Sequence, residues 1–166
     1  GGLRKGGRGY FCLDVTNAGT ITESDASSVV KWEYAGINDG DLGYSYSRAY
    51  IVKTKAAGWV VVFGNGYGSS DEKAVLYVID IDDSTGSIVS TYKLDTGVSG
   101  CNGLYTPAII DPEADGYVDF AYAGDLKGNL WKFDLSGSNT SDWKIAFGTI
   151  SEIGRASCRE RVCHRV

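Results

Sequence analysis

Short runs of alternating apolar and polar residues dominate the chain, and several of them close on an aspartate that is followed by a glycine-bearing turn. Three such segments are GYFCLDVTNAG, VLYVIDIDDSTG and NLWKFDLSGSN, which centre on Asp14, Asp80 and Asp134. Alternation of this kind predicts β-strands, because successive side chains of a strand point to opposite faces of a sheet. The Asp-to-Asp steps of 66 and 54 residues indicate an internal repeat, somewhat longer than the roughly 40–50 residues of a propeller repeat.

Each of these segments is followed by another strand candidate, and two further strand pairs precede the second and third segments. The third unit therefore has four predicted strands, at about residues 104–110, 117–123, 129–135 and 143–147. A helical stripe of period 3.6 is absent. The pattern predicts an all-β fold built from four-stranded antiparallel propeller blades. On this count the chain holds two whole blades and the outer half of another, about two and a half in all.

Composition agrees with many short strands joined by tight turns: the chain has 23 Gly, 11 Tyr and 4 Trp but only 2 Pro. We expect the tryptophans to pack between blades rather than to stack on a ligand. No apolar run reaches the ~18 residues that a membrane-spanning helix needs. Cys12 and Cys101 could pair in an oxidising compartment or be two buried small hydrophobic residues, with the unpaired state slightly favoured.

The last stretch, SEIGRASCRERVCHRV (residues 151–166), does not match the rest of the chain. We interpret it as sequence derived from a cloning vector, so the propeller is predicted to occupy residues 1–150. The absence of Met suggests that the chain is part of a longer protein. Leaving out the tail, with its four arginines and two glutamates, moves the formal net charge from −5 to −7. Such an acidic body argues against nucleic-acid binding. The tail also contains His164, the sole histidine, so no catalytic triad is available.

The stretch DPEADGYVD (residues 111–119) places four acidic residues at alternating positions around one glycine. Calcium prefers oxygen ligands, and a tight loop delivers them from alternating positions. The glutamate at position 12 of an EF-hand is missing, so the loop is a shorter type suited to β-proteins. A polar turn between two strands is the alternative, and Glu113 stands where Asp or Asn is usual. The predicted calcium ligands are the side chains of Asp111, Glu113, Asp115 and Asp119 and the backbone carbonyl of Tyr117.

Two other motifs resemble ligand-binding loops but are better interpreted as structural turns. The glycines of FGNGYGSS resemble a phosphate loop, but a strand follows them where a helix would be required, so we predict a hairpin connection. In DIDDSTG, Asp80 is predicted to bond local backbone N–H groups, as Asp14 and Asp134 would, rather than to chelate a second cation. Asp125 is likewise assigned to a turn.

Beyond these patterns, the segments GGRGYFCLDVTN, DLGYSYSRAYIVKTK, GWVVVFGNGY and, above all, YAGDLKGNLWKFDLSG resemble the C-terminal propeller of the PilC/PilY family. These are type IV pilus-associated assembly and tip proteins with a quinoprotein-like β-propeller. The resemblance extends to about residue 150. It implies a secreted protein of the periplasm, outer membrane and pilus tip of a Gram-negative bacterium.

The same resemblance implies a non-enzymatic module that promotes pilus extension by opposing retraction and that contributes to surface adhesion. Its partners would be minor pilins and a host or abiotic surface, and calcium in an Asp-rich propeller loop would control its activity. Two alternatives stay open from the sequence. One is a quinoprotein dehydrogenase with a redox cofactor in the central channel, and the other is a calcium-stabilised propeller that binds carbohydrate or a receptor.

Overall fold

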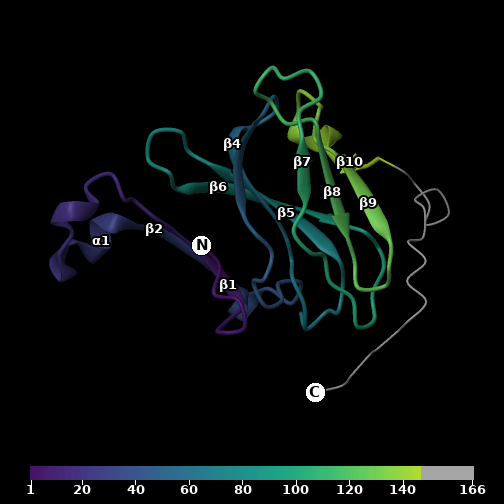
Figure 1. The fold of residues 1–166 in the computed structure, drawn as a ribbon, viewed down its shortest axis with the longest axis horizontal. Coiled ribbons are helices and arrows are strands. Elements are labelled where there is room, and N and C mark those ends of the chain that lie inside the picture. The colour runs from purple at the N-terminus through teal and green to yellow at the C-terminus, as the bar shows by residue number, and fades with distance from the viewer. Residues whose placement is uncertain (147–166) are drawn as a thin grey trace.

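The computed structural model of the chain describes residues 1–146, which form three antiparallel sheets side by side (Figure 1). The first pairs two strands, and the second and third each contain four strands in sequential order. This confirms the predicted all-β fold of two blades and half of another. The strands are β1 (Gly9–Leu13), β2 (Val30–Ala35), β3 (Tyr50–Thr54), β4 (Gly58–Gly64), β5 (Val75–Ile81), β6 (Ile88–Asp95), β7 (Ala108–Ile110), β8 (Phe120–Gly124), β9 (Leu130–Asp134) and β10 (Lys144–Ile145).

The middle sheet is buried on both faces, which explains the unbroken apolar run of β4. Alternate side chains of this strand enter two different cores. Val60 and Val62 pack toward β8 and β9 of the third sheet, whereas Val61 and Phe63 pack toward Tyr10 of the first. A strand covered on both faces needs apolar residues at every position. The sheets thus bury each other's faces, as neighbouring blades of a propeller do.

Helical structure is confined to short pieces. The single α-helical segment of the described residues, α1 (Ala26–Val29), lies between β1 and β2 and has four residues. It follows a capping box in which Thr22 and Asp25 satisfy each other's backbone amides, an arrangement typical of a helix start. No helix within residues 1–146 has the length and apolar character that crossing a membrane would require.

Connections at the two ends of the sheets differ in chemistry, and we name the ends accordingly. The acidic end comprises the β3–β4 turn (residues 55–57) and the β7–β8 loop (residues 111–119), which projects at the top of Figure 1. The tyrosine end comprises the β2–β3, β4–β5 and β6–β7 connections, at residues 36–49, 65–74 and 96–107. Because consecutive strands are antiparallel, these two sets of connections lie at opposite ends of each sheet.

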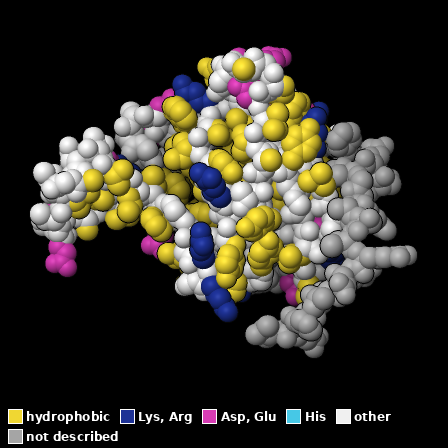
Figure 2. Space-filling view, in the orientation of Figure 1, with side chains coloured by type: hydrophobic (Ala, Val, Ile, Leu, Met, Phe, Trp, Pro, Cys, Tyr) yellow, Lys and Arg dark blue, Asp and Glu magenta, His cyan; other side chains and the backbone are white. Residues whose placement is uncertain are grey.

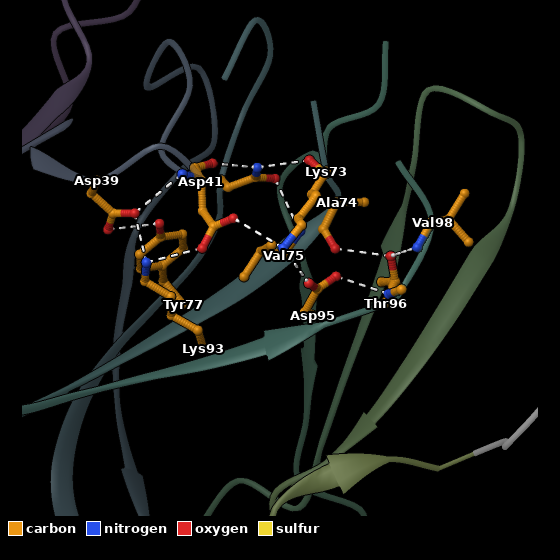
Figure 3. Close-up of polar contacts among 12 residues, drawn as sticks. Asp39, Asp41, Lys73, Ala74, Val75, Tyr77, Lys93, Asp95, Thr96 and Val98 are labelled. Atoms are coloured by element: carbon orange, nitrogen blue, oxygen red, sulfur yellow. Dashed lines mark hydrogen bonds and ion pairs between the residues drawn. The ribbon is translucent and has the colours of Figure 1, made fainter. Parts of the chain in front are cut away.

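The β2–β3 connection is fastened to the middle sheet by a polar cluster (Figure 3). Lys93 on β6 donates to Asp39 at 2.6 Å and to Asp41 at 3.0 Å. The hydroxyl of Tyr77 on β5 donates to the other oxygen of Asp39 at 2.9 Å. Burial opposes ionisation of Asp39, but the bonds from Lys93 and the tyrosines outweigh it and hold the pKa of its carboxyl below the usual value. The cluster therefore keeps a charged loop ordered against the sheet.

Candidate metal site

The β7–β8 loop is anchored at its base by backbone hydrogen bonds to three different strands. Asp119 closes the loop by donating its amide to Ile110 at 3.1 Å, and its carbonyl accepts from Leu135 at 2.8 Å. The amide of Val118 donates to the carbonyl of Lys53 on β3 at 2.7 Å. The loop thus belongs to the third sheet but leans on the second, so it lies between two blades.

Inside the loop, the first carboxylate organises the turn. The two oxygens of Asp111 accept from the amides of Asp115 at 3.3 Å and Gly116 at 2.9 Å. Ala114 and Gly116 adopt left-handed backbone angles, with φ of 54° and 86°, and this curls the chain back on itself. Asp115 in turn accepts from the amide of Tyr117 at 2.9 Å. Gly116, the one glycine of the loop, thus lies where the chain turns sharply.

The remaining carboxylates of the loop converge on one cation, the ammonium of Lys55 in the β3–β4 turn. Its Nζ lies 3.3 Å from Asp115, 3.8 Å from Asp119 and 4.0 Å from Glu113. The side chain of Asp119 is only 8% exposed, whereas that of Glu113 is 72% exposed at the rim. The hydrogen bond and charge of Asp115 raise the pKa of Lys55. The Tyr117 amide, followed by Lys55, lowers the pKa of Asp115.

The structure therefore brings together three of the four predicted acidic ligands, and it brings them to a lysine that the sequence analysis missed. The fourth, Asp111, accepts hydrogen bonds from amides of the loop instead. The amide of Tyr117 donates to Asp115, and the Tyr117 ring is partly exposed. The repeat could have pointed to Lys55. This residue lies in the turn KTKAAG, which joins the first two strands of the second sheet as the acidic loop joins the first two strands of the third.

As arranged, no group of three or more His, Cys, Asp or Glu side chains within residues 1–146 surrounds a point that would hold a metal ion. In the acidic loop three carboxylates are turned toward Lys55, and that of Asp111 is turned toward loop amides. The donor chemistry nevertheless fits calcium, since all the side-chain donors are hard oxygens gathered in one curled loop. Three of them already face a single positive charge. The residues present are therefore compatible with calcium once Lys55 moves aside.

Aspartates also close the turns between the third and fourth strands, but one predicted position is wrong. Asp14 accepts from the amide of Thr16 at 3.0 Å and Asp134 from that of Ser136 at 3.0 Å, as predicted. In the second sheet this role belongs to Asp82, which accepts from the amide of Ser84 at 3.0 Å. Bonds from the side chain and then the amide of Thr16 lower the pKa of Asp14 to about 2. Bonds from the hydroxyl of Ser84, followed by those from Thr85, lower the pKa of Asp82 to about 2.

Asp80, the residue predicted for that turn, instead lies within β5, opposite Val60 of β4 and Ser90 of β6. A register shift after Asp80 carries the strand further before it turns. Burial, aided by Asp83, raises the pKa of the Asp80 carboxyl. The pattern Asp-x-Ser/Thr, which Asp82 satisfies and Asp80 does not, would have identified the turn.

The other interpretations made from the motifs are confirmed. FGNGYGSS joins the antiparallel strands β4 and β5. Asp125 organises the β8–β9 turn, accepting from the amides of Lys127 and Asn129 at 3.0 and 2.8 Å. Cys12 and Cys101 are unpaired, as favoured, but they are not buried as expected: Cys12 is partly buried and Cys101 is exposed. The tail of residues 151–166 lies outside the described residues, so its vector origin stays a prediction.

Three of the four tryptophans pack between sheets as predicted. Trp131 and Trp143 are buried in the core between the second and third sheets. Trp32 packs against the other core and donates its indole N–H to Gly86 at 2.9 Å. Trp59 is the exception, being 37% exposed with the ammonium of Lys53 4.9 Å from its ring centroid.

Comparison with known proteins identifies the family. The family model described as the PilY1 beta-propeller domain matches residues 1–151. The chain belongs to the PilY1 β-propeller family. It is similar to the crystal structure of the Pseudomonas aeruginosa PilY1 C-terminal domain, with a TM-score of 0.71 and 37% identity over 89% of this chain and 32% of that one.

Relatives in the PilY1 family are named for type IV pilus biogenesis. The chain is 40% identical over 156 residues to the type IV pilus biogenesis factor PilY1 homolog of Xylella fastidiosa. It is 41% identical over 142 residues to the type IV pilus biogenesis factor PilY1 of Pseudomonas aeruginosa strain UCBPP-PA14. These matches cover 89% and 86% of this chain but only 10% and 12% of the relatives. The chain thus spans about a tenth of the length of these proteins.

Proposed function

We propose that this chain is a calcium-responsive part of a type IV pilus biogenesis factor. The observation that carries the proposal is the convergence of three carboxylates of the acidic loop on Lys55, within a chain that belongs to the PilY1 family. A loop that already gathers negative charge around a single cation can exchange that cation for a divalent one. The named role of the relatives supports the assignment to pilus biogenesis.

Electrostatics favours such an exchange. One ammonium compensates one unit of charge, whereas three carboxylates face it, so net negative charge remains in the loop. Calcium supplies two charges and accepts six to eight oxygens. The side chains of Asp111, Glu113, Asp115 and Asp119 and the carbonyl of Tyr117 would hold it. The exposed Glu113 carboxylate is the most adjustable of these donors.

The exchange would alter the junction between two blades. Lys55 belongs to the second sheet and the acidic loop to the third, so their ion pairs join the blades at the acidic end. A divalent ion within the loop would release the lysine and stiffen the loop itself. The backbone bond from Val118 to Lys53 would keep the two segments adjacent. The switch is therefore local, and it changes the surface presented at this end.

In the complete protein we propose that the propeller acts as a rigid, non-enzymatic scaffold at the pilus tip. It would promote pilus extension by opposing retraction, with minor pilins as partners, and would contribute to adhesion to host or abiotic surfaces. The protein would be secreted across the envelope of a Gram-negative bacterium. The family membership supports the pilus role, and the accessible acidic loop supports its regulation by calcium.

Thermal unfolding of the full-length protein with and without calcium tests the regulatory part. Calcium at a hundred times its Kd should stabilise the folded state by about 2.7 kcal/mol, because it binds only that state. Asp115→Ala and Asp119→Ala should abolish the rise in melting temperature. Asp83→Ala, an exposed acid in another turn at the same end, should retain it. A rise that survives both loop substitutions would place calcium elsewhere.

The pilus part is tested in cells by replacing the gene with the Asp115→Ala allele and counting surface pili at high and low calcium. The proposal expects fewer pili than wild type only where calcium is present, and recovery of pili when retraction is blocked genetically. Equal pilus numbers in both alleles under all conditions would contradict calcium control, whatever the binding data show.

A further inference from the structure

At the tyrosine end, three connections stack backbone against backbone. The amide of Gly66 donates to Leu104 at 2.9 Å, and the amide of Tyr44 donates to Tyr67 at 2.7 Å. A Cβ on Gly66 would overlap the carbonyl oxygen of Tyr44, and a Cβ on Gly103 would overlap that of Gly66. Glycine is required at such points because the chains approach too closely for any side chain.

The buried side chain of Asn65 ties this stack together. Its amide nitrogen donates to the carbonyls of Asp41 at 2.7 Å and Lys73 at 2.8 Å. Its oxygen accepts from the amides of Val75 at 3.1 Å and Leu104 at 2.9 Å. Together with the adjacent cluster around Asp41 (Figure 3), it fixes the loops to the middle sheet. The exposed side chains of these loops are therefore carried on a backbone that is already ordered in the unbound protein.

What they present is a row of tyrosines. The ring centroids of Tyr46 and Tyr67 lie 6.1 Å apart, and those of Tyr67 and Tyr105 lie 5.9 Å apart with nearly parallel planes. Tyr46 is 38% exposed and Tyr105 50% exposed. Burial raises the pKa of Tyr67 to about 12, so its ring stays neutral under physiological conditions. One tyrosine comes from each of the three connections.

Arginines border this row. Arg4 lies opposite Ser45 in an antiparallel bridge, and Arg8 lies over the ring of Tyr44 at 5.4 Å. Arg48 lies over the ring of Tyr50 at 5.3 Å. Arg4, Arg48 and Tyr46 also line a cleft of about 640 Å³ between the first and second sheets. In the lower middle of the view, Lys and Arg side chains lie among hydrophobic ones (Figure 2).

These are all the arginines of residues 1–146, and none of them forms an ion pair with an acid in that part of the chain. By contrast, four lysines do: Lys31, Lys55, Lys73 and Lys93. In a chain with a formal net charge of −5, acidic partners are abundant, so a cluster of arginines without them is notable. Arg8 and Arg48 pack on aromatic rings, and Arg8 also donates to the hydroxyl of Ser70 at 3.2 Å. A guanidinium has five N–H donors, so others are left to bind a carboxylate through two parallel hydrogen bonds.

We propose that this surface, formed by Arg4, Arg8, Arg48, Tyr46, Tyr67 and Tyr105, binds an acidic polypeptide segment of a partner protein. Tyrosine and arginine are the residue types that carry most binding energy in protein interfaces, and a surface held rigid beforehand loses little entropy on binding. Each guanidinium can bind one carboxylate of an acidic segment. The surrounding negative charge disfavours a continuous polyanion or an anionic membrane, whose charge would extend beyond the patch. The inference does not depend on the calcium site.

Fluorescence anisotropy of a labelled peptide of about ten residues, in which glutamate alternates with serine so that its charges are spaced apart, tests the proposal with the full-length protein. Wild type should bind the peptide at 0.15 M salt. The double substitution Arg4→Gln/Arg48→Gln should weaken binding by about tenfold or more, as loss of charge-assisted contacts does. The matched control Lys53→Gln/Lys144→Gln removes the same charge elsewhere and should stay within about twofold of wild type. Tyr105→Ala should weaken binding without any change in charge, as expected of an interface aromatic residue.

Melting curves of each variant confirm that the fold is retained. Equal weakening in the two double variants would overturn the proposal, since net charge alone would then explain the binding. It would also be overturned if the peptide failed to bind, or if phosphatidylglycerol vesicles or inorganic phosphate bound in an arginine-dependent manner where the peptide did not.

Discussion

The acidic end and the tyrosine end use the same residue types for opposite purposes. Asp125, at the tyrosine end, is half-buried and accepts hydrogen bonds from Asn102, Asn129 and Trp131 as well as from turn amides. Asp115, at the acidic end, accepts one backbone bond from another residue and otherwise faces Lys55. Acidic side chains stand on the projecting loop at the top of the molecule (Figure 2). Polar groups at the tyrosine end therefore stabilise the fold, whereas those at the acidic end are available to a ligand.

Two glycines with similar backbone angles give the largest test of this difference. Gly66 has φ +74° and would clash with Tyr44 on gaining a Cβ, whereas Gly116 has φ +86° and open space around it. Left-handed backbone costs alanine about 1 kcal/mol in either place. We expect Gly116→Ala to lose about that much stability and Gly66→Ala to lose about 3 kcal/mol or more, because its backbone must move.

Urea unfolding of both variants in calcium-free buffer measures this difference. Equal losses would mean that the stacked loops of the tyrosine end yield easily, and the contrast in rigidity between the two ends would disappear.

The two aspartates provide the next test. Asp125→Ala would leave the indole N–H of Trp131 and two asparagine amides without their acceptor, at a cost of about 2–4 kcal/mol. Asp115→Ala removes a solvent-screened ion pair and should cost much less than Asp125→Ala without calcium. The same unfolding measurements compare the two. A loss at Asp115 as large as that at Asp125 would show that the acidic loop is also a structural element.

The pH dependence of stability should distinguish Asp125 from Asp115, because the pKa values of the two carboxyls are lowered by different interactions. Burial opposes ionisation of Asp125, but bonds from Asn129, Trp131 and Asn102 outweigh it and lower its pKa, while the Tyr117 amide and then Lys55 lower that of Asp115. A folded-state pKa below the unfolded value of about 3.9 gives stability that is present above that pH and is lost as pH falls below it.

We therefore expect the melting temperature to fall as the pH drops below about 4, and to fall less steeply in Asp125→Asn. Because 1 M salt screens exposed pairs, it should reduce the contribution of Asp115 and spare that of Asp125. Parallel melting curves of wild type and Asp125→Asn across this range would contradict the assignment.

The sequence predicted most of the architecture because strand alternation and turn residues are local signals. Asp14 and Asp134 close their turns as predicted. The strands of the third sheet form near the predicted runs, although β7 begins at Ala108 and β8 at Phe120 rather than near residues 104 and 117. Asp80 failed because a register shift in β5 depends on pairing with its neighbours, and pairing is not visible in one strand.

The sequence predicted the carboxylates of the candidate site but not its lysine, for a related reason. The loop carboxylates are contiguous in the chain, so their spacing could be read directly. Lys55 lies more than fifty residues earlier and reaches them only because two sheets pack side by side. The tyrosine row has the same character, since its three members come from three separate connections.

Calcium titration calorimetry of three proteins tests the exchange of lysine for calcium most directly: wild type, Lys55→Met and the control Lys53→Met. If calcium displaces the Lys55 ammonium, removing that charge should tighten calcium binding by about tenfold, since the competing cation lies within 4.0 Å of three carboxylates. Lys53→Met should bind as wild type does. Equal affinity in Lys55→Met and wild type, or no calcium binding in any of the three, would contradict the exchange.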